Sequence, residues 1–230
     1  MKILGFQKLS LTDYDGFLCC TIFLFGCNML CPFCHNKDLV IKNPKTKEIN
    51  LEEILDYLNK NRGKIEAVCI TGGEPTVNPD LATLLKKIKE LGFLIKLDTN
   101  GTNTRLLETL IGENLIDYVA IDFKNSLNFY PQTIGLNKFN HLSLLNSIAL
   151  LKENKIKYEL RTTLVKELHT EVSIMEMAQT LSGENILFLQ KFVDSGNCLE
   201  EGLHPISYEE ALKFKKILEK EIKTVKLRGY

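Results

Sequence analysis

The sequence predicts an α/β fold, a partial (β/α)6 TIM-like barrel. Apolar runs bounded by turn residues recur along the 230 residues, and a segment with helical periodicity follows most of them. About six such strand and helix pairs imply a parallel sheet with helices outside it, and an open sheet is the alternative. The length suits a single domain over residues 1–230, with an N-terminal extension over about residues 1–16.

Each predicted element follows from a local pattern. Apolar runs predict strands at 17–26, 66–71, 93–98, 117–122, 157–163 and 185–190. Apolar residues three and four positions apart predict helices at 51–62, 80–91, 104–112, 141–153, 171–182 and 207–221. The segment 37–50 has basic and turn residues without a period, which predicts a loop, and residues 224–230 predict a short terminal strand.

The composition narrows the classes of function. The chain has 29 basic and 29 acidic residues, so no bulk charge attracts nucleic acid or an anionic membrane. No stretch reaches the ~18 apolar residues of a membrane span, and the N-terminus lacks the apolar run of a secretory signal. Seven cysteines, an odd number, suit a reducing compartment better than a disulfide framework. We therefore expect a cytoplasmic protein with a metal site, without nucleic acid or membrane as partner.

Residues that carry chemistry should stand directly after the predicted strands. In parallel α/β folds, functional side chains gather at the carboxyl ends of the strands. Four segments stand there: the cysteine-containing loop 27–36, "TGGEP" at 71–75, "DTNG" at 98–101 and "DFK" at 122–124. Arg161 is also expected to end a strand.

Three cysteines in the loop 27–36 have the spacing CxxxCxxC: Cys27, Cys31 and Cys34. Thiolates are soft ligands that suit zinc or an iron–sulfur cluster. A zinc site with His35 as the fourth ligand is less favoured, because zinc sites usually draw ligands from two separated pairs. Buried structural thiols are less favoured still, because the loop is polar. Three thiolates on a [4Fe–4S] cluster leave one iron open to a substrate, which is the interpretation we favour.

These motifs resemble those of the radical S-adenosylmethionine (SAM) superfamily. Phe33 precedes the last cysteine, and "TGGEP" follows the next strand. More narrowly, "GFQKLSLTDYDG", "CPFCHN", "ITGGEP", "KLDTNGTN", "VAIDFK" and "LRTTLV" occur in this order and are similar to the activating proteins of glycyl radical enzymes. The nearest resemblance is to the activator of anaerobic ribonucleoside-triphosphate reductase, which is related to the activator of pyruvate formate-lyase.

The resemblance implies a reaction and its participants. One [4Fe–4S] cluster would bind SAM and cleave it reductively, and the 5′-deoxyadenosyl radical would take a hydrogen atom from a glycine of a partner enzyme. Anaerobic ribonucleotide reductase is the first expected partner, and flavodoxin or ferredoxin is the expected electron donor. No catalytic side chain is implied beyond the cluster and the SAM site.

The resemblance also implies which residues bind SAM. They are Phe33, Asn36, Gly72, Gly73, Glu74, Asp98, Lys124 and Arg161. A monovalent cation beside the SAM carboxylate is implied at Asp98, Thr99 and Asp122, together with the Ala120 carbonyl. Taken alone, these residues have simpler explanations: a tight turn for the glycines, helix caps for the cation ligands and surface charges for Lys124 and Arg161.

Two departures and two alternatives accompany the resemblance. Asp15 stands where relatives typically have proline, and Gln190 stands where the pyruvate formate-lyase activator has histidine, so the roles of Asp13 and Gln190 are not carried over. Cys198 has no assigned role. The first alternative is a radical SAM enzyme that acts on a small molecule, such as a deazapurine synthase. The second is a non-enzymatic iron–sulfur or zinc protein, which would have no use for Glu74 or Lys124.

Overall fold

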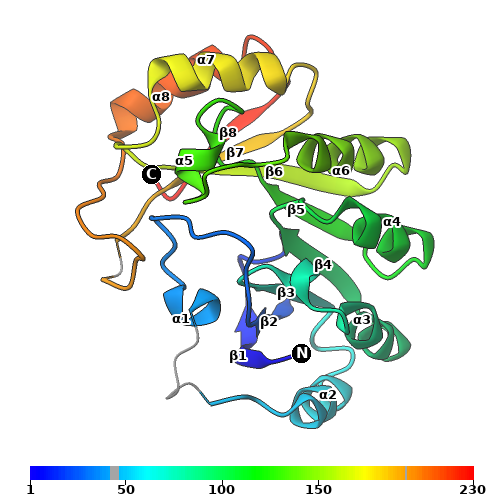
Figure 1. Ribbon diagram of the computed structural model, residues 1–230. Coiled ribbons are helices and arrows are strands. Elements are labelled where there is room, and N and C mark those ends of the chain that lie inside the picture. The colour runs from blue at the N-terminus through cyan, green and yellow to red at the C-terminus, as the bar shows by residue number, and fades with distance from the viewer. Residues whose placement is uncertain (42–46, 195) are drawn as a thin grey trace. The chain divides into compact units, whose positions relative to one another are not determined.

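The computed structural model describes residues 1–41, 47–194 and 196–230 (Figure 1). The chain forms two compact units, and each unit takes in three segments of the chain. The first unit comprises Met1–Asn28, Asp38–Ala120 and Leu142–Tyr158, and the second comprises Met29–Lys37, Ile121–His141 and Glu159–Tyr230. The assignment of residues 1–230 to a single domain stays a prediction.

The described residues form eight strands, which follow one another in sequence order through the sheet. The strands are β1 (Ile3–Ser10), β2 (Cys19–Leu24), β3 (Ala67–Gly72), β4 (Leu94–Thr99), β5 (Tyr118–Asp122), β6 (Lys157–Leu164), β7 (Leu187–Lys191) and β8 (Val225–Arg228). In the first unit β1 is antiparallel to β2, whereas β2, β3 and β4 are parallel. In the second unit β6, β7 and β8 are parallel. The predicted strands, including the terminal one, are confirmed.

Six helices match the predicted helical segments (Figure 1). They are α2 (Leu51–Lys60), α3 (Leu81–Glu90), α4 (Thr104–Gly112), α6 (His141–Glu153), α7 (Glu171–Thr180) and α8 (Tyr208–Leu218). Side chains of Asn50, Asn103, Thr170 and Ser207 accept hydrogen bonds from backbone N–H groups of the first turns, which fixes where four of these helices begin.

Some elements escaped the sequence prediction. Strand β1 lies in the predicted N-terminal extension. Only its two end residues are buried, and its sequence lacks the alternation of apolar and polar residues that would have predicted a strand. The prediction of a loop over 37–50 is wrong at α1 (Lys37–Val40), and residues 42–46 of that segment lie outside the described residues. The short helices η1 (Pro75–Val77) and α5 (Tyr130–Thr133) also went unpredicted, because one turn is too short to show a period.

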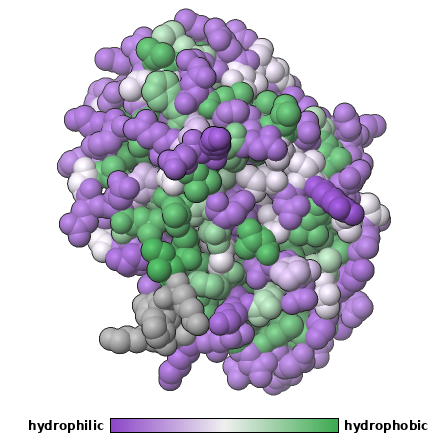
Figure 2. Space-filling view, in the orientation of Figure 1, coloured by the Kyte–Doolittle hydropathy of each residue, from purple (hydrophilic) through white to green (hydrophobic). Residues whose placement is uncertain are grey.

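The parallel strands form the core. Every residue of β2 except Phe23 is buried, and β3 is buried from Ala67 to Ile70, as expected for strands that are covered on both faces. Figure 2 shows one face of the protein, on which hydrophobic residues are interspersed among hydrophilic ones. Within the described residues, no helix is long and apolar enough to cross a membrane.

Candidate functional site

The cysteine motif is shared between the two units in sequence. Cys27 follows β2 in the first unit and is half-buried. Cys31 and Cys34 belong to the second unit, where Cys31 is 7% exposed and Cys34 is half-buried. The Cys34 N–H donates to the Cys31 carbonyl at 3.0 Å, so these two residues share one tight turn. A turn of this kind brings two thiols to one side of a loop.

The chain just before this turn is anchored to the loop after α5, within the second unit. The Leu30 N–H donates to the Ile134 carbonyl at 2.9 Å. Gly135 has φ +67°, and a Cβ atom built there would lie 2.2 Å from the Leu30 carbonyl oxygen. Only glycine allows both the left-handed backbone and this close approach. The turn of Cys31 and Cys34 therefore begins from a fixed point.

Burial and the charge of Lys124 have opposite effects on the pKa of Cys31. Burial raises the pKa of the Cys31 thiol, and the positive charge of Lys124 opposes that rise. Among the residues that the structure describes, no three histidine, cysteine, aspartate or glutamate side chains are gathered as a group that could hold a metal ion. The three-cysteine ligand set therefore stays a prediction.

A segment after β7 contacts the backbone of the motif in the second unit. The Glu200 N–H donates to the Pro32 carbonyl at 3.0 Å, and the Asn197 side-chain amide donates to the His35 carbonyl at 3.4 Å. The thiol of Cys198 lies 3.9 Å from the Phe33 carbonyl oxygen. These contacts bring hydrogen-bond donors from a distant segment to the backbone carbonyl groups of the cysteine loop. Sequence analysis assigned no role to this segment.

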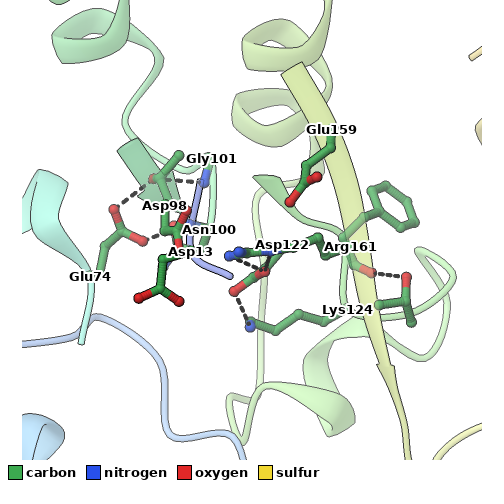
Figure 3. A network of polar contacts seen from close by, with 12 residues as sticks. Asp13, Glu74, Asp98, Asn100, Gly101, Asp122, Lys124, Glu159 and Arg161 are labelled. Atoms are coloured by element: carbon green, nitrogen blue, oxygen red, sulfur yellow. Dashed lines mark hydrogen bonds and ion pairs between the residues drawn. The ribbon is translucent and has the colours of Figure 1, made fainter. Parts of the chain in front are cut away.

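Asp122, Lys124 and Arg161 form one ionic cluster in the second unit (Figure 3). Arg161 contacts Oδ1 of Asp122 through Nε and a terminal nitrogen, both at 2.9 Å, and Lys124 Nζ lies 3.3 Å from Oδ2. Burial alone would raise the pKa of Asp122, but the two cations outweigh it and lower the pKa to about 2. The cluster brings two basic side chains with several N–H donors to one place. Such donors are suited to contact an anion.

The structure corrects one expectation about this cluster. Arg161 was expected to end a strand, but it lies inside β6, three residues before the last residue, Leu164. Its side chain is 11% exposed, and that of Lys124 is 17% exposed, so neither is an ordinary surface charge. The Lys124 ammonium also lies 5.8 Å from the centre of the Phe33 ring. Phe33 and the ionic cluster are thus neighbours.

Two buried rings that sequence analysis left without a role hold the backbone of Lys124. The Lys124 N–H donates to the Tyr130 hydroxyl at 3.2 Å, and that hydroxyl donates to the Asp122 carbonyl at 3.2 Å. His169 Nε2 lies 2.9 Å from the Lys124 carbonyl oxygen and Nδ1 accepts the Val165 N–H at 3.1 Å. Nδ1 also lies 3.2 Å from the Val165 carbonyl oxygen. The Lys124 carbonyl can only accept, so Nε2 carries a proton, and burial lowers the pKa of His169 and so favours a neutral ring.

The two glycines of "TGGEP" allow backbone segments of the first unit to meet. A Cβ atom on Gly72 would lie 2.3 Å from the Leu24 carbonyl oxygen, and one on Gly73 would lie 2.2 Å from the Gly26 carbonyl oxygen. Gly72 also has φ +127°. The end of β3 therefore packs against the segment that leads to Cys27. The expected approach of a ligand to these glycines stays a prediction.

Glu74 connects the ends of β3 and β4 in the first unit (Figure 3). It is 1% exposed, and its Oε1 accepts from the Thr76 N–H at 3.0 Å, the Thr76 hydroxyl at 2.5 Å and the Thr99 hydroxyl at 2.7 Å. Its Oε2 accepts from the Asn100 N–H at 2.6 Å. Burial raises the pKa of Glu74, and these donors oppose the rise. The chain itself uses this carboxylate, and its expected contact with SAM stays a prediction.

The turn after β4 also binds the residue that follows Cys27. The Asn100 amide donates to the Asn28 side-chain oxygen at 2.7 Å, and the Asn28 amide donates to the Thr102 hydroxyl at 2.9 Å. Thr102 in turn donates through its hydroxyl to the Asn100 side-chain oxygen at 2.6 Å. Three polar side chains thereby fix the start of the cysteine motif to the "DTNG" turn. These contacts join distant parts of the sequence, so no local pattern could have indicated them.

The remaining predicted residues have different surroundings. The Asp98 side chain is 14% exposed and forms an ion pair with Lys96, with 3.4 Å between Oδ1 and Nζ. Thr99 is 3% exposed, and its oxygen accepts the Gly101 N–H at 3.1 Å while its hydroxyl donates to Glu74. Asn36 is half-buried in the second unit. Lys96 was missed, although a charged residue inside the apolar run at 93–98 was a visible signal.

Comparison with known proteins gives the family. The family model described as the Radical SAM superfamily matches residues 21–181. A Methanocaldococcus jannaschii protein with the provisional name of glycyl-radical enzyme activating enzyme is 35% identical over 195 residues, which cover 82% of this chain and 78% of that protein. The 7-carboxy-7-deazaguanine synthase of Haemophilus influenzae is 33% identical over 102 residues, or 44% of this chain and 42% of the synthase.

A solved structure agrees with the fold. A domain of the pyruvate-formate lyase-activating enzyme from Bacteroides vulgatus superposes with a TM-score of 0.55 at 19% identity, covering 70% of this chain and 98% of that one. At this identity the likeness concerns the fold alone. Together with the family model, it confirms the predicted fold class.

Proposed function

The chain belongs to the radical SAM superfamily, and on this premise we propose that it activates a glycyl radical enzyme. The observation that carries the proposal is the 35% identity, over 82% of the chain, to a relative named for this activity. Anaerobic ribonucleoside-triphosphate reductase is the first proposed partner, on the local motifs quoted above, and pyruvate formate-lyase is the second. Flavodoxin or ferredoxin is the proposed electron donor.

The family implies a [4Fe–4S] cluster and SAM, and the chain offers suitable donors. Cys27, Cys31 and Cys34 would hold the cluster, since thiolates are its usual ligands. When bound and reduced, the cluster supplies the electron that cleaves SAM. The shared turn of Cys31 and Cys34, and the positive charge of Lys124 near Cys31, fit thiolate ligation.

The ionic cluster of the second unit supports a role in binding the SAM carboxylate. Lys124 and Arg161 are two basic side chains beside Asp122, and both are mostly buried, which strengthens their attraction for an anion. Asp122 keeps the two cations together and in one orientation. Phe33 offers an apolar ring next to this charge. Asn36, Gly72, Gly73, Glu74 and Asp98 remain proposed SAM residues from the resemblance.

The radical chemistry can be tested without the partner. Protein reconstituted with iron and sulfide in the absence of oxygen is reduced and mixed with SAM, and 5′-deoxyadenosine is quantified. We expect product from the wild type and from Cys69→Ala, which removes a buried thiol outside the motif, and none from Cys31→Ala. A fully loaded cluster that binds no SAM and yields no deoxyadenosine would contradict the proposal.

The partner is tested by electron paramagnetic resonance. The reconstituted protein is mixed with SAM and either purified anaerobic ribonucleotide reductase or pyruvate formate-lyase. We expect a glycyl radical signal with the reductase, and loss of the signal when the radical-bearing glycine of the reductase is changed to alanine. A signal with pyruvate formate-lyase alone would move the assignment to that partner.

A small-molecule substrate is the second candidate. The similarity to a deazaguanine synthase favours it, but that match covers 44% of the chain, whereas the match to the activating enzyme covers 82%. If neither glycyl radical enzyme acquires a radical, while the substrate of the synthase is converted in step with deoxyadenosine release, this candidate replaces the activase.

A further inference from the structure

Lys96 is a buried lysine in the first unit. It lies on β4 with a side chain that is 5% exposed. An ammonium group that leaves water must regain its lost hydration from nearby carbonyl groups, carboxylates or aromatic rings. A lysine in such a place therefore needs partners on the chain.

The partners of Lys96 come from three parts of the first unit. Its Nζ donates to the Asp13 carbonyl at 2.6 Å, lies 3.4 Å from Oδ1 of Asp98 and lies 5.8 Å from the centre of the Tyr118 ring. Lys96 and Asp98 are two residues apart on one strand, so their side chains share a face. The Asp98 carboxylate thus has an ammonium group as its neighbour in the folded chain.

The position of Asp13 supports this arrangement. Thr21 on β2, Cys69 on β3 and Lys96 on β4 stand in register across the parallel strands. The Thr21 hydroxyl donates to the Asp13 carboxylate at 2.5 Å, and Lys96 donates to the carbonyl of the same residue. Asp13 is therefore held from two strands, and Lys96 is held by a hydrogen bond to Asp13 while its charge faces Asp98.

The side chains expected to ligate a monovalent cation have positively charged or hydrogen-bonding neighbours on the chain. In the first unit Oδ1 of Asp98 faces the Lys96 ammonium at 3.4 Å without a hydrogen bond between them, and the Thr99 hydroxyl donates to Glu74. In the second unit Asp122 is paired with Arg161 and Lys124. A further cation near Asp98 would meet the positive charge of Lys96. The charge of Lys96 therefore disfavours a metal cation directly beside Asp98.

We propose that Lys96 is the built-in cation of Asp98, a positioning residue that makes the enzyme independent of monovalent metal ions. The ammonium group supplies the single positive charge that a sodium or potassium ion would otherwise bring to this carboxylate. The proposal rests on the proposed function where it concerns SAM. Its structural part, the pairing of Lys96 with Asp98, concerns the protein alone.

The test compares salts at equal ionic strength. Melting temperature and SAM cleavage are measured in potassium, sodium and tetramethylammonium chloride, the last being too large to coordinate a carboxylate closely. Wild-type values should differ by less than about twofold in rate among the salts. Lys96→Met should lose at least about tenfold of its rate in tetramethylammonium and regain most of it in potassium or sodium, because removal of one partner leaves a buried charge unpaired.

Three further variants make the result specific. Lys96→Arg keeps the charge and should stay independent of the salt. The double variant Lys96→Met with Asp98→Asn removes both charges and should show no response to metal ions. Lys87→Met removes an exposed lysine that lies 3.3 Å from Glu52, and it should behave as the wild type.

The outcomes separate this proposal from the proposed function. Broadening of the sodium NMR signal by folded Lys96→Met, but not by the wild type, would support the pairing even in a protein that cleaves no SAM. Absence of SAM cleavage in the wild type would instead count against the proposed function. A wild-type rate that rises about tenfold on addition of potassium, or a folded Lys96→Met without any response to metal ions, would overturn the proposal.

Discussion

Glu74 accepts hydrogen bonds from four donor groups on three residues, and these hydrogen bonds define its structural role. A carboxylate has two oxygens and no donor, so it can serve all four donors at once. The backbone of Asn100 and the side chains of Thr76 and Thr99 are thereby fixed to one point. Glu74 is therefore a positioning residue for the ends of β3 and β4, whatever else it binds.

Glu74→Gln should unfold more easily than the wild type. The glutamine amide would direct N–H groups at one of the four donors, leaving a buried donor without an acceptor. We expect a loss of about 2–4 kcal/mol in the free energy of unfolding, measured by urea denaturation. Glu108→Gln on the exposed face of α4 is the control and should change stability by less than about 0.5 kcal/mol. A similar small change at Glu74 would show that its hydrogen bonds are dispensable.

Asp122 should make stability depend on pH in the acid range. Its pKa is about 2 in the folded protein, against an ordinary value of 3.8, so the ionised form stabilises the fold above about pH 4. This contribution is lost as the pH falls from about 4 towards 2. It amounts to at most about 2 kcal/mol, and less because the side chain is 33% exposed.

The measurement is urea denaturation of the apoprotein at a series of pH values. Asp122→Asn should be less stable than the wild type near neutral pH, because Lys124 and Arg161 lose their counter-charge. The difference between the two proteins should shrink on acidification. A difference that stays constant down to about pH 2 would argue against the ion pairs as its source.

Close approaches between elements determine where the functional loops begin. Gly72 and Gly73 bring the end of β3 to the segment after β2, and Gly135 brings the loop after α5 to Leu30. At each of these glycines, a carbonyl group of another segment occupies the space that a side chain would fill. The loops that carry the predicted cluster and SAM residues are thus attached at their starts by backbone contacts.

Gly135→Ala should destabilise the second unit strongly. The new Cβ atom would lie 2.2 Å from the Leu30 carbonyl oxygen, and alanine would also be strained at φ +67°. We expect a loss of about 2–4 kcal/mol. Gly183→Ala is the matched control, since its φ is +80° but nothing lies within 4 Å of its Cβ, so it should cost about 1 kcal/mol of strain alone. Equal losses in thermal or urea denaturation would show that the contact with Leu30 is unimportant.

The charge balance of the whole molecule governs its long-range interactions. Equal numbers of basic and acidic residues give a formal net charge of +0, and the ionic cluster of the second unit gathers two basic side chains at Asp122. Because the cluster is small and mostly buried, its attraction should act on a small anion that enters it and not on a polyanion in solution.

The protein should therefore bind heparin and duplex DNA no better than a neutral protein of its size. We expect elution from a heparin column below about physiological salt, measured beside a basic nucleic-acid-binding protein as a positive control. Retention well above physiological salt would point to a basic surface that the overall charge conceals, and would reopen nucleic acid as a partner.

The sequence by itself determined the strands and helices whose signals are local. Apolar runs predicted β2 to β8, helical periods predicted the six long helices, and the motifs predicted the family. The cysteine spacing and the order of the polar segments could be recognised because each is written in consecutive residues.

Only the tertiary structure decided which side chains meet. The contacts of Glu74 with Thr99 and Asn100, of Lys96 with Asp13, and of Arg161 with Asp122 all join residues that are distant in the sequence. Strand β1 belongs to the same class, since pairing with β2 forms it where its own residues show no alternation. A buried charged group forms ion pairs and hydrogen bonds with the groups that the fold places next to it, and no local sequence pattern specifies those groups.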